Sequence, residues 1–525
     1  MDTSSSHLVE YSTVLGTLAV IFYVIPYLLD PYDYRRRFPG PPLAGFSNWW
    51  MSSAIRTGRH SEIVQQLHAK YGTFVRLGPN HISIADPSAL ETIYGHGSGT
   101  LKSDFYLTFQ NGPKTNTFTA MDKAEHSKKR RRLANMFSPQ NVLAFEPRVR
   151  SHIRQLCAQW DLKCKDAANG ISGPNWASWN GQATMNICAQ FSYLAFDTIG
   201  DLALGSPFGL IQAQTDSSLS IESVDESGEP IRGTLRVPVI KTIAGSVATD
   251  TALGVFPAWT HKLLRLLPWN ISGIADRTNL FNLAVASVEA RVKRGPRKDT
   301  EDGEQSIDMI DKLLEVKDDD GNPLKADELY AEALVLLVAG SDTTSNTLSS
   351  LCYHLAIHPD IQQKLQTELD THIPYTSSDE TNEKEGLVAP AYETIACYDR
   401  IKNLPYLNAC VKEALRIHST IGTGMPRSVP LGKTITVAGQ TFKAGPERWL
   451  EDGAESLNKY FAPFSVGPRA CIGRNLANME LALMAASLFR RYEVTALPTT
   501  KMVIDESFVR QAVNCEVGIR RRTVV

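Results

Sequence analysis

The sequence predicts a mainly α-helical fold with small β-sheets, preceded by an N-terminal transmembrane helix. Three observations predict this architecture: helical periodicity along most of the chain, two short strand-like segments early in it, and one uninterrupted apolar segment before them. The 525 residues, 43% of them hydrophobic, can form a large core. The formal net charge of −2 provides no global field that would attract nucleic acid, so we expect no nucleic-acid partner.

The apolar segment runs from Tyr11 to Leu29 and contains no charged residue. A helix of about 20 apolar residues spans a bilayer, and the arginines at 35–37 predict that the following chain stays on the cytoplasmic side. A buried amphipathic helix is the alternative, which apolar residues on nearly every face of the segment disfavour. Prolines then stiffen the chain. We therefore expect three parts: a membrane anchor with a basic flank (1–38), a proline-rich hinge (39–54) and a globular domain (55–525).

Within the globular domain, two short strands are expected at 74–78 and 81–85, joined by a turn at Pro79-Asn80. Most of the remaining chain has helical periodicity. Polar stretches rich in Ser, Asp, Glu or Lys predict surface loops at residues 215–233, 294–305 and 376–386.

Eight cysteines are present and none forms a CxxC pair, so the sequence does not favour a zinc or dithiol site. Cys471 lies in the segment FSVGPRACIG, residues 464–473, and a helical pattern follows it. A nearby cation and a helix N-terminus both stabilise a thiolate. Gly467 and Gly473 allow a tight turn beneath a flat macrocycle, and Arg469 can pair with a carboxylate. A buried structural cysteine is the alternative, which the complete pattern disfavours.

A long helical pattern extends from Ala326 to Ile357, which at ~1.5 Å per residue covers about 48 Å, enough to cross a domain. It contains the polar cluster Ser341-Asp342-Thr343-Thr344 directly after apolar residues at 334–338, so we expect the cluster to be buried. Its hydroxyls can bond to the preceding turn, loosen the helix and make room beside it. The N-cap of a second helix is the alternative interpretation.

The segment around Cys471 resembles the haem-binding loop of the cytochrome P-450 family, whose pattern is Phe-x-x-Gly-x-Arg-x-Cys-x-Gly. All five fixed positions match, at Phe464, Gly467, Arg469, Cys471 and Gly473. The resemblance covers nearly the whole chain. It implies a cytochrome P-450 fold, haem b as the cofactor and Cys471 as the axial thiolate ligand of its iron. It also implies a haem-thiolate monooxygenase, in which the thiolate favours O–O cleavage and one oxygen atom of O₂ enters a small organic substrate.

The resemblance implies roles for further residues. Asp342 and Thr343 match the acid–alcohol pair with which the family relays protons to the bound oxygen. His126 and Arg130 lie where the family usually has Trp and Arg, and a histidine there is a departure that is still compatible with a haem propionate. Arg427 matches another propionate partner of the family.

Glu413 and Arg416 lie at i and i+3 of a predicted helix, and such a pair taken alone is a surface ion pair worth little. In the family, the matching residues form a buried pair joined by an arginine that corresponds to Arg448. The resemblance therefore implies a structural network of these three residues around the haem loop.

The resemblance also implies electron donors and a location. NADPH-cytochrome reductase is the expected partner, with a b-type cytochrome as a further donor, and the basic run at 128–132 is its expected contact. A solvated basic face is the alternative for this run. The implied location is the endoplasmic reticulum membrane, which the chain would cross once, with the catalytic domain in the cytosol.

Several stretches look closest to fungal benzoate 4-monooxygenase-type enzymes, which favours an aromatic, benzoate-like substrate. Related fungal enzymes tailor secondary metabolites, so that function stays open as an alternative. The stretches are residues 94–99, 101–106, 186–200, 202–209 and 416–420.

One part of the chain is shorter than the family requires. Arg416 and Cys471 are 55 positions apart (471 − 416), and Gly445 directly precedes Pro446, where another strand, a short helix and an irregular segment are expected. A lost exon in the gene model or a real deletion would explain this junction. A second function class therefore stays open, namely a catalytically impaired haem-fold protein.

Overall fold

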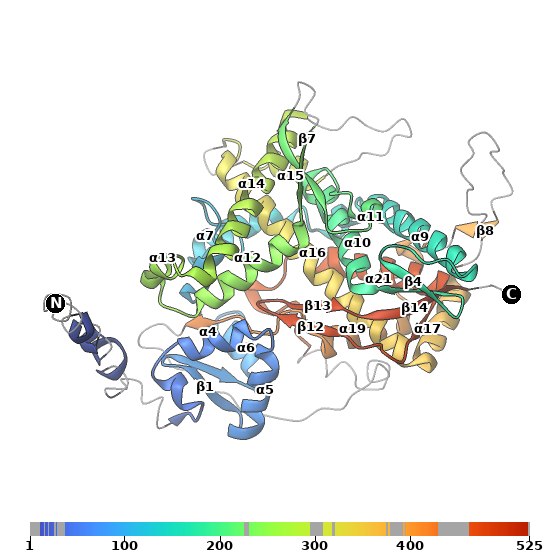
Figure 1. Cartoon of the computed structure of the whole chain (residues 1–525). Coiled ribbons are helices and arrows are strands. Elements are labelled where there is room, and N and C mark those ends of the chain that lie inside the picture. Colours follow the sequence, from blue (N-terminus) through green and yellow to red (C-terminus); the bar gives the residue numbers. More distant parts are fainter. Residues whose placement is uncertain are drawn as a thin grey trace, which may run out of the picture.

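Helices predominate and the strands form small sheets, so the predicted fold class is confirmed at this level (Figure 1). The computed structural model describes residues 11–14, 16–18, 20–25, 28, 37–224, 230–294, 308–317, 321–373, 376–377, 392–393, 395–428 and 461–522.

The longest helix, α16 (Ala326–Ile357), has 32 residues and lies at the centre of the molecule (Figure 1). Its bounds are those that the hydrophobic periodicity predicts. Helix α10 (Ile187–Leu204) packs along it and is buried on nearly every face, because apolar residues occur all round the helix. Helices α21 (Arg474–Arg491) and α19 (Pro405–Ile417) also contact α16.

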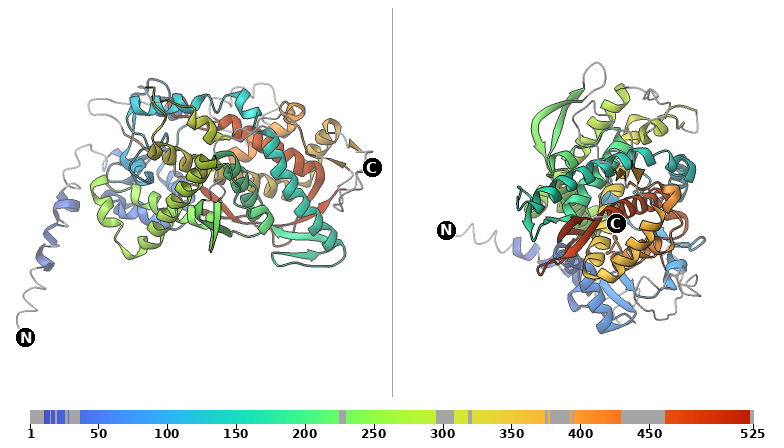
Figure 2. Two further views of the ribbon diagram at one scale, coloured as in Figure 1. Left: turned by 90° about the horizontal axis from the view of Figure 1, so that it is seen from above. Right: turned by 90° about the vertical axis from the view of Figure 1, so that its right-hand side faces the viewer.

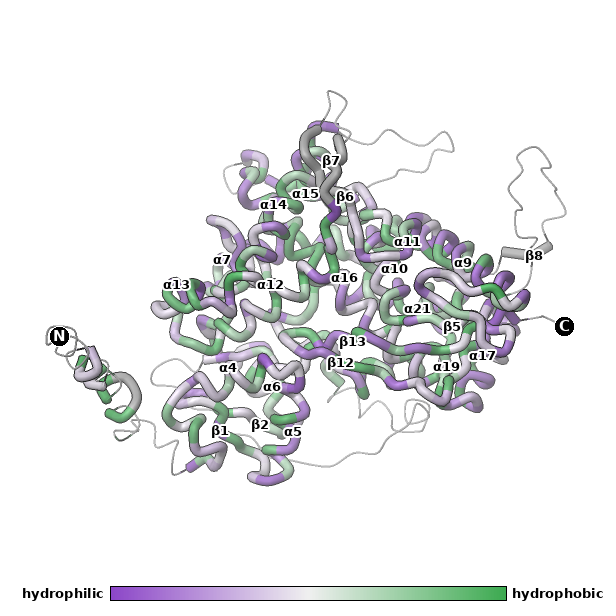
Figure 3. The backbone as a smooth tube through the Cα atoms, in the orientation of Figure 1, coloured by the Kyte–Doolittle hydropathy of each residue, from purple (hydrophilic) through white to green (hydrophobic). Residues whose placement is uncertain are grey.

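The remaining helices pack around this centre, and outer ones such as α9 and α17 carry many hydrophilic residues (Figure 3). They are α4 (Trp49–Arg56), α5 (His60–Tyr71), α6 (Ala89–Tyr94), α7 (Lys123–Ala134), α8 (Pro139–Leu143), α9 (Glu146–Ala168), α11 (Leu210–Ala213), α12 (Val239–Gly254), α13 (His261–Leu264), α14 (Ile271–Arg294), α15 (Met309–Leu314), α17 (Pro359–His372) and α18 (Tyr398–Ile401).

The strands form a four-stranded sheet in the order β11-β14-β5-β4 and several two-stranded sheets, all of them antiparallel. The four-stranded sheet lies at the opposite end of the molecule from α13 (Figures 1 and 2). Its strands are β4 (Trp176–Trp179), β5 (Gln182–Asn186), β11 (Tyr492–Ala496) and β14 (Glu516–Arg521). The two-stranded sheets contain β1 (Phe74–Gly78), β2 (His81–Ile84), β3 (Leu101–Lys102), β6 (Ser218–Val224), β7 (Pro230–Val237), β8 (Thr376–Ser377), β9 (Tyr392–Glu393), β10 (Arg427–Ser428), β12 (Val503–Glu506) and β13 (Arg510–Asn514).

The sheets confirm one expectation and correct another. Strands β1 and β2 form the expected early pair. The surface loop expected at 215–233 is wrong in part, because β6 and β7 form an antiparallel hairpin there. Apolar residues such as Leu219 and Ile221 alternate with polar ones along β6, which is the pattern of a strand, but the many Ser and Glu residues suggested a loop.

The structure does not directly test the membrane span that is expected in the N-terminal segment. Its described part includes a π-helical turn at Val20–Val24. Among the helices that the structure describes, none is both long enough and apolar enough to cross a bilayer. The transmembrane helix and the chain divisions after residues 38 and 54 therefore stay predictions.

Some expected features lie outside the described residues. These are most of the loops expected at 294–305 and 376–386, and the whole stretch 429–460, which includes Gly445, Pro446 and Arg448.

Candidate functional site

The loop that precedes α21 presents the thiol of Cys471. The backbone N–H of Cys471 donates a hydrogen bond of 2.8 Å to the carbonyl of Phe464, which closes the loop. Gly467 has a φ of +72°, and a Cβ atom there would lie 2.1 Å from the carbonyl oxygen of Tyr94. Only glycine fits this position, because its φ favours glycine and the close contact leaves no room for a side chain. The tight turn expected at Gly467 is therefore confirmed, and its role beneath a cofactor stays a prediction.

Gly473 has a different role from the one expected. It caps α21 with a φ of −82°, which any residue adopts, so a tight turn does not explain it. A Cβ atom at this position would lie 4.0 Å from Sγ of Cys471 and 3.7 Å from the ring of Phe137. The absence of a side chain at Gly473 therefore keeps space open beside the sulfur.

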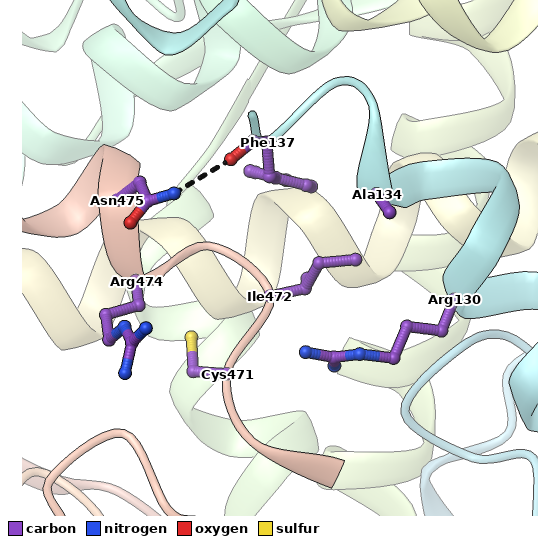
Figure 4. Close-up of a pocket in the computed structure, with 7 residues that line it drawn as sticks. All are labelled: Arg130, Ala134, Phe137, Cys471, Ile472, Arg474 and Asn475. Atoms are coloured by element: carbon purple, nitrogen blue, oxygen red, sulfur yellow. Dashed lines mark hydrogen bonds between the residues drawn. The ribbon is translucent and has the colours of Figure 1, made fainter. Parts of the chain in front are cut away.

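The thiol opens onto a cavity of about 200 Å³, and two arginines lie beside it (Figure 4). Cys471 is exposed to this cavity, but desolvation by the surrounding protein atoms raises the pKa of its thiol by more than the backbone N–H of Gly473 and the charges of Arg130 and Arg474 lower it. The nearby cations therefore do not hold a thiolate by themselves, contrary to expectation. A bound metal cation would do so, because a coordinating thiol is deprotonated. The cavity is lined by Arg130, Ala134, Phe137, Cys471, Ile472, Arg474 and Asn475.

Arg469 of this loop belongs to a cluster of cations. Lys102 and Arg427 are paired residues of the β3–β10 ladder, although like charges directly opposite one another are destabilising. Nη1 of Arg469 donates to the carbonyl of Ala120 at 2.7 Å, and Nη1 of Arg427 donates to the hydroxyl of Tyr106 at 2.6 Å. The two arginines and the lysine thus converge from distant parts of the sequence.

The electrostatics of this cation cluster (Lys102, His126, Arg427 and Arg469) favour an anionic partner. Burial lowers the pKa of Lys102 to about 6, with further contributions from Arg469 and Arg427. Burial and these cations also lower the pKa of His126 to about 3 and that of Arg469 to about 10. Of the described carboxylates only that of Asp122 opposes these shifts, and it acts on Arg469 alone. The cluster is therefore suited to bind a carboxylate.

Arg130 is placed differently from the expectation that pairs it with His126. Its Nη1 donates a hydrogen bond of 2.6 Å to the carbonyl of Ala470, next to Cys471, and its side chain lines the thiol cavity (Figure 4). It acts on His126 only electrostatically. The role of Arg130 toward a propionate stays a prediction.

On α16, Asp342 and Thr343 point in different directions. Asp342 is buried, its Oδ1 has no hydrogen-bond partner among the described residues, and burial raises its pKa to about 7. Thr343 is only half buried, and its hydroxyl donates to the carbonyl of Ala339 at 2.8 Å, as expected for a back-bonded hydroxyl. The helix is nevertheless continuous across this segment, so the expected loosening is not seen.

The arginine and glutamate of α19 form the expected pair. Arg416 donates two hydrogen bonds of 2.8 Å to the carboxylate of Glu413, in bidentate geometry. The side chain of Glu413 is 7% exposed and that of Arg416 is 34% exposed, so the pair is only half buried. Arg448, the expected third member, lies outside the described residues.

Most of the chain, residues 39–518, matches the sequence model of one protein family. The family model named "Cytochrome P450" matches residues 39–445 and 442–518. This chain belongs to the cytochrome P450 family. The P450 is 34% identical to "Benzoate 4-monooxygenase bphA" of Aspergillus niger, over 98% of both chains. It is 27% identical to "Pisatin demethylase" of Fusarium vanettenii over 94% of both chains, and 26% identical to "Tryprostatin B 6-hydroxylase" of Neosartorya fischeri over 91% of this chain and 81% of that one.

The protein is accordingly a P450 monooxygenase, and its family binds haem through an axial cysteine thiolate. The residues of this P450 fit two parts of the cofactor, the iron that a thiolate would ligate and the propionate groups. Cys471 presents its sulfur beside a space that Gly473 keeps open. The cation cluster provides partners for carboxylates, which the two haem propionates are, and whose negative charge would offset the repulsion between Lys102 and Arg427.

The match to the family model is divided into two ranges. Its two ranges meet at 442–445, next to the short junction of Gly445 and Pro446. The alignment with the benzoate 4-monooxygenase extends over 542 positions, whereas this chain has 525 residues, so at least 17 positions (542 − 525) face no residue of the P450.

Two residues of the site are absent from the sequence predictions. Lys102 lies in one of the stretches that resemble the benzoate-type enzymes, but nothing in its local sequence reveals that Arg427 lies opposite. Glu480 is buried on α21, accepts a hydrogen bond of 3.1 Å from the hydroxyl of Thr344 on α16, and has its pKa raised to about 8 by burial. A charged residue at an apolar helical position is the signal that could have identified Glu480.

Proposed function

We propose that this P450 hydroxylates a small aromatic acid of the benzoate type, with O₂ and with electrons that NADPH supplies through a reductase. The observation that carries this proposal is the identity of 34% with a benzoate 4-monooxygenase over nearly the whole of both chains. Haem, when bound, supplies the activation of O₂. The residues of the chain position it, deliver protons and hold the substrate.

An aromatic cluster supports an aromatic substrate. The rings of Phe105, Phe109, Phe118 and Phe508 lie with centroids 5.3 to 6.2 Å apart. Tyr106 joins this aromatic cluster to the cation cluster, because its ring lies 5.2 Å from that of Phe118 and its hydroxyl accepts the bond from Arg427. Flat aromatic molecules pack favourably against such rings.

The ligation test uses the thiol. We expect Cys471→Ala to remove the reduced carbon-monoxide band at the long-wavelength position typical of thiolate haem. Cys397→Ala is the matched control, since Cys397 is also a free cysteine and lies on another segment. The band should persist in the control, and its persistence in Cys471→Ala would contradict the assignment. Incubation of the wild type with benzoate then tests the substrate, with 4-hydroxybenzoate as the expected product.

Tailoring of a fungal secondary metabolite is the second candidate. It is supported by the tryprostatin B 6-hydroxylase and pisatin demethylase relatives, which align over most of this chain. The higher identity with the benzoate enzyme favours the first candidate. Failure to oxidise benzoate by a protein with a normal carbon-monoxide spectrum would favour the second.

We propose that electrons arrive on the side of α7. Two cations of the basic run at 128–132 already have partners within the protein, because Lys129 and Arg132 pair with Glu328 and Glu332 of α16. Arg131 remains exposed on this helix. Arg131→Glu should therefore raise the reductase concentration needed for half-maximal turnover, whereas an unchanged concentration would contradict the docking face.

We also propose attachment to the endoplasmic reticulum membrane through the apolar N-terminal segment and a second surface. That surface, the α13 patch, consists of large apolar side chains that are at least 56% exposed, and such patches mark lipid or protein contacts. It lies at one edge of the molecule, around α13 (Figure 1). Its members are Trp259, Leu263, Leu266, Trp269 and Ile271.

Membrane attachment is tested in two steps. Deletion of residues 1–38 should release the protein from microsomes only in part, because the α13 patch stays. Adding Leu263→Ser and Leu266→Ser should release the remainder, whereas Leu162→Ser, at an exposed leucine of α9, should not. A full-length protein that is soluble without detergent would contradict the proposal.

A further inference from the structure

We propose that Arg265 and Arg277 form a binding site for the carboxylate of an incoming aromatic acid. The inference rests on the proposed function, since it names the group of the substrate that is recognised. Arg265 directly follows α13, and Arg277 lies in α14. The site therefore lies among α12, α13 and α14, next to the α13 patch.

Two guanidinium groups lie within electrostatic reach of one carboxylate at this place, and only Arg277 bonds to it. Asp250 of α12 is buried and accepts a hydrogen bond of 2.5 Å from Nη1 of Arg277, while Arg265 interacts electrostatically with both. His261 also faces Arg265, but burial lowers its pKa, so it is neutral at pH 7. Asp104 acts on His261 and is not among the groups that act on Arg265. Arg265, Arg277 and Asp250 together therefore carry a net positive charge.

Arg265 has the free donors that an anion needs. Its guanidinium makes no hydrogen bond or ion pair with the described residues, although its Nε lies buried. A buried donor without an acceptor costs ~1–3 kcal/mol, and more when it is charged. A carboxylate satisfies a guanidinium with two parallel hydrogen bonds. A small organic acid is thus the class of ligand that this side chain fits.

Arg277 connects the site to the aromatic cluster. Its guanidinium donates hydrogen bonds to the carbonyls of Thr108 and Gln110, the two residues that flank Phe109. The ring of Phe109 lies 5.3 Å from those of Phe105 and Phe508. A ligand held by its carboxylate at the arginines therefore has an aromatic surface at hand, and benzoate combines these two groups.

The location predicts an effect on binding. Positive charge near a surface of low polarity raises the local concentration of anions. The arginines are not among the residues that line the thiol cavity, so they affect how the acid enters and is held. Loss of Arg265 should therefore raise KM for an acid substrate and leave kcat nearly unchanged.

The experiment compares benzoate with benzamide, its neutral analogue, by titration calorimetry on the full-length protein. Arg265→Gln should raise the Kd for benzoate about tenfold, which corresponds to ~1.4 kcal/mol, and leave that for benzamide within twofold. Arg265→Lys should lie between the two, because it keeps the charge and loses the forked geometry. Lys262→Gln is the matched control, since it removes an exposed positive charge from the same segment and should change neither constant.

In the calorimetry, four outcomes would overturn the site: wild-type protein that does not bind benzoate, an unchanged Kd in Arg265→Gln, an equal loss for benzamide, or an effect of Lys262→Gln as large as that of Arg265→Gln. A phosphate of an anionic lipid has similar chemistry. Loss of binding to phosphatidylserine vesicles in Arg265→Gln with unchanged binding of benzoate would therefore also overturn it. If benzoate binds as expected but is not hydroxylated, the proposed function fails and the carboxylate site stands.

Discussion

At the scale of single residues, Lys102 shows how a binding site differs from a packed core. Burial and two arginines lower the pKa of its ammonium group, and among the described residues its Nζ has only the carbonyl of Phe118 and the faces of two aromatic rings as partners. Cation–π contacts are worth ~0.5–2 kcal/mol, which does not offset the burial of an ammonium group. An anionic ligand would, because each hydrogen bond to a charged partner contributes ~1.5–3 kcal/mol.

We therefore expect Lys102→Met to weaken haem binding by about tenfold, or ~1.4 kcal/mol, through the loss of one bond to a propionate. The methionine keeps most of the volume, so the fold should be preserved. Haem transfer to apomyoglobin measures the change. Lys123→Met, at an exposed lysine of α7, is the control and should transfer haem at the wild-type rate. Equal rates for both variants would exclude Lys102 as a propionate partner.

Proton delivery gives a second prediction for single residues. The carboxyl of Asp342 has a pKa of about 7, so near neutral pH it can both donate a proton and regain one. Thr343→Ala should keep haem and substrate binding but divert electrons to peroxide, with several-fold less product per NADPH consumed. Thr347→Ala, one turn further along α16, removes a similar back-bonded hydroxyl and should stay coupled. Unchanged coupling in Thr343→Ala would remove this residue from the mechanism.

Glu480 predicts the pH dependence of stability. Burial raises its pKa from 4.5 to about 8 in the folded state, so the folded protein binds a proton that the unfolded chain releases above pH 4.5. The contribution of Glu480 to the free energy of unfolding is therefore complete below pH 4.5. It decreases by up to ~1.4 kcal/mol per pH unit as the pH rises from 4.5 to about 8. Glu480→Gln mimics the protonated form and should raise Tm at pH 8 more than at pH 5. An equal change at both values would show that Glu480 is ionised in the fold.

The motif around Cys471 is local, so the sequence could predict the thiol, Gly467 and Arg469 together. The cation cluster could be predicted only in part. His126, Arg427 and Arg469 were identified through the family pattern, but Lys102 depends on the pairing of β3 with β10, which joins residues more than 300 positions apart. The net charge state of Cys471 also depends on burial, which local sequence does not report.

At the scale of elements, a buried ionic junction holds α7 and α16 together. Nζ of Lys129 lies 3.7 Å from Glu332, and both side chains are at most 6% exposed. The same carboxylate accepts hydrogen bonds from the backbone and the hydroxyl of Thr117, at 3.2 and 2.9 Å. The helix on the expected electron side and the loop that carries Phe118 are thus fixed to one residue of α16.

This junction gives a prediction for a double-mutant cycle. Lys129→Met leaves the Glu332 carboxylate buried without its cation, which should cost ~3–5 kcal/mol. The double variant Lys129→Met/Glu332→Met removes both charges and should recover most of that loss. Arg131→Met, at an exposed position of the same helix, should change stability by less than about 0.5 kcal/mol. Urea unfolding followed by circular dichroism measures these three variants and Glu332→Met, which completes the cycle, and additive effects would contradict the coupling.

Helices and hairpins differed in how well their sequences predicted them. Periodicity gave the bounds of α16 because apolar residues recur over 32 residues. The β6–β7 hairpin was missed, since seven residues of alternating Ser, Leu, Ile and Glu give a weak signal inside a polar region. Short elements depend on a partner strand for their stability, and a single strand does not show where that partner is.

At the scale of the whole molecule, the position of the family break is the strongest constraint on activity. A continuous match would give one range, whereas two ranges that meet at 442–445 indicate that family positions without a counterpart fall at the Gly445–Pro446 junction. The resemblance places Arg448 directly after this junction, as the partner of Glu413. Arg416 donates two hydrogen bonds to Glu413 in bidentate form, and the pair is half buried, while Arg448 lies outside the described residues.

We therefore predict that the chain of 525 residues folds marginally and holds haem poorly, and that the native transcript encodes additional residues between Gly445 and Pro446. If the short junction keeps Arg448 from reaching Glu413 and Arg416, the incomplete charge network costs ~3–5 kcal/mol, which is comparable to the whole stability margin of a domain. Haem titration of this chain measures the first part, with occupancy well below one haem per protein expected. Sequencing the transcript across the junction measures the second. Full occupancy with normal turnover would show instead that the fold tolerates the short connection.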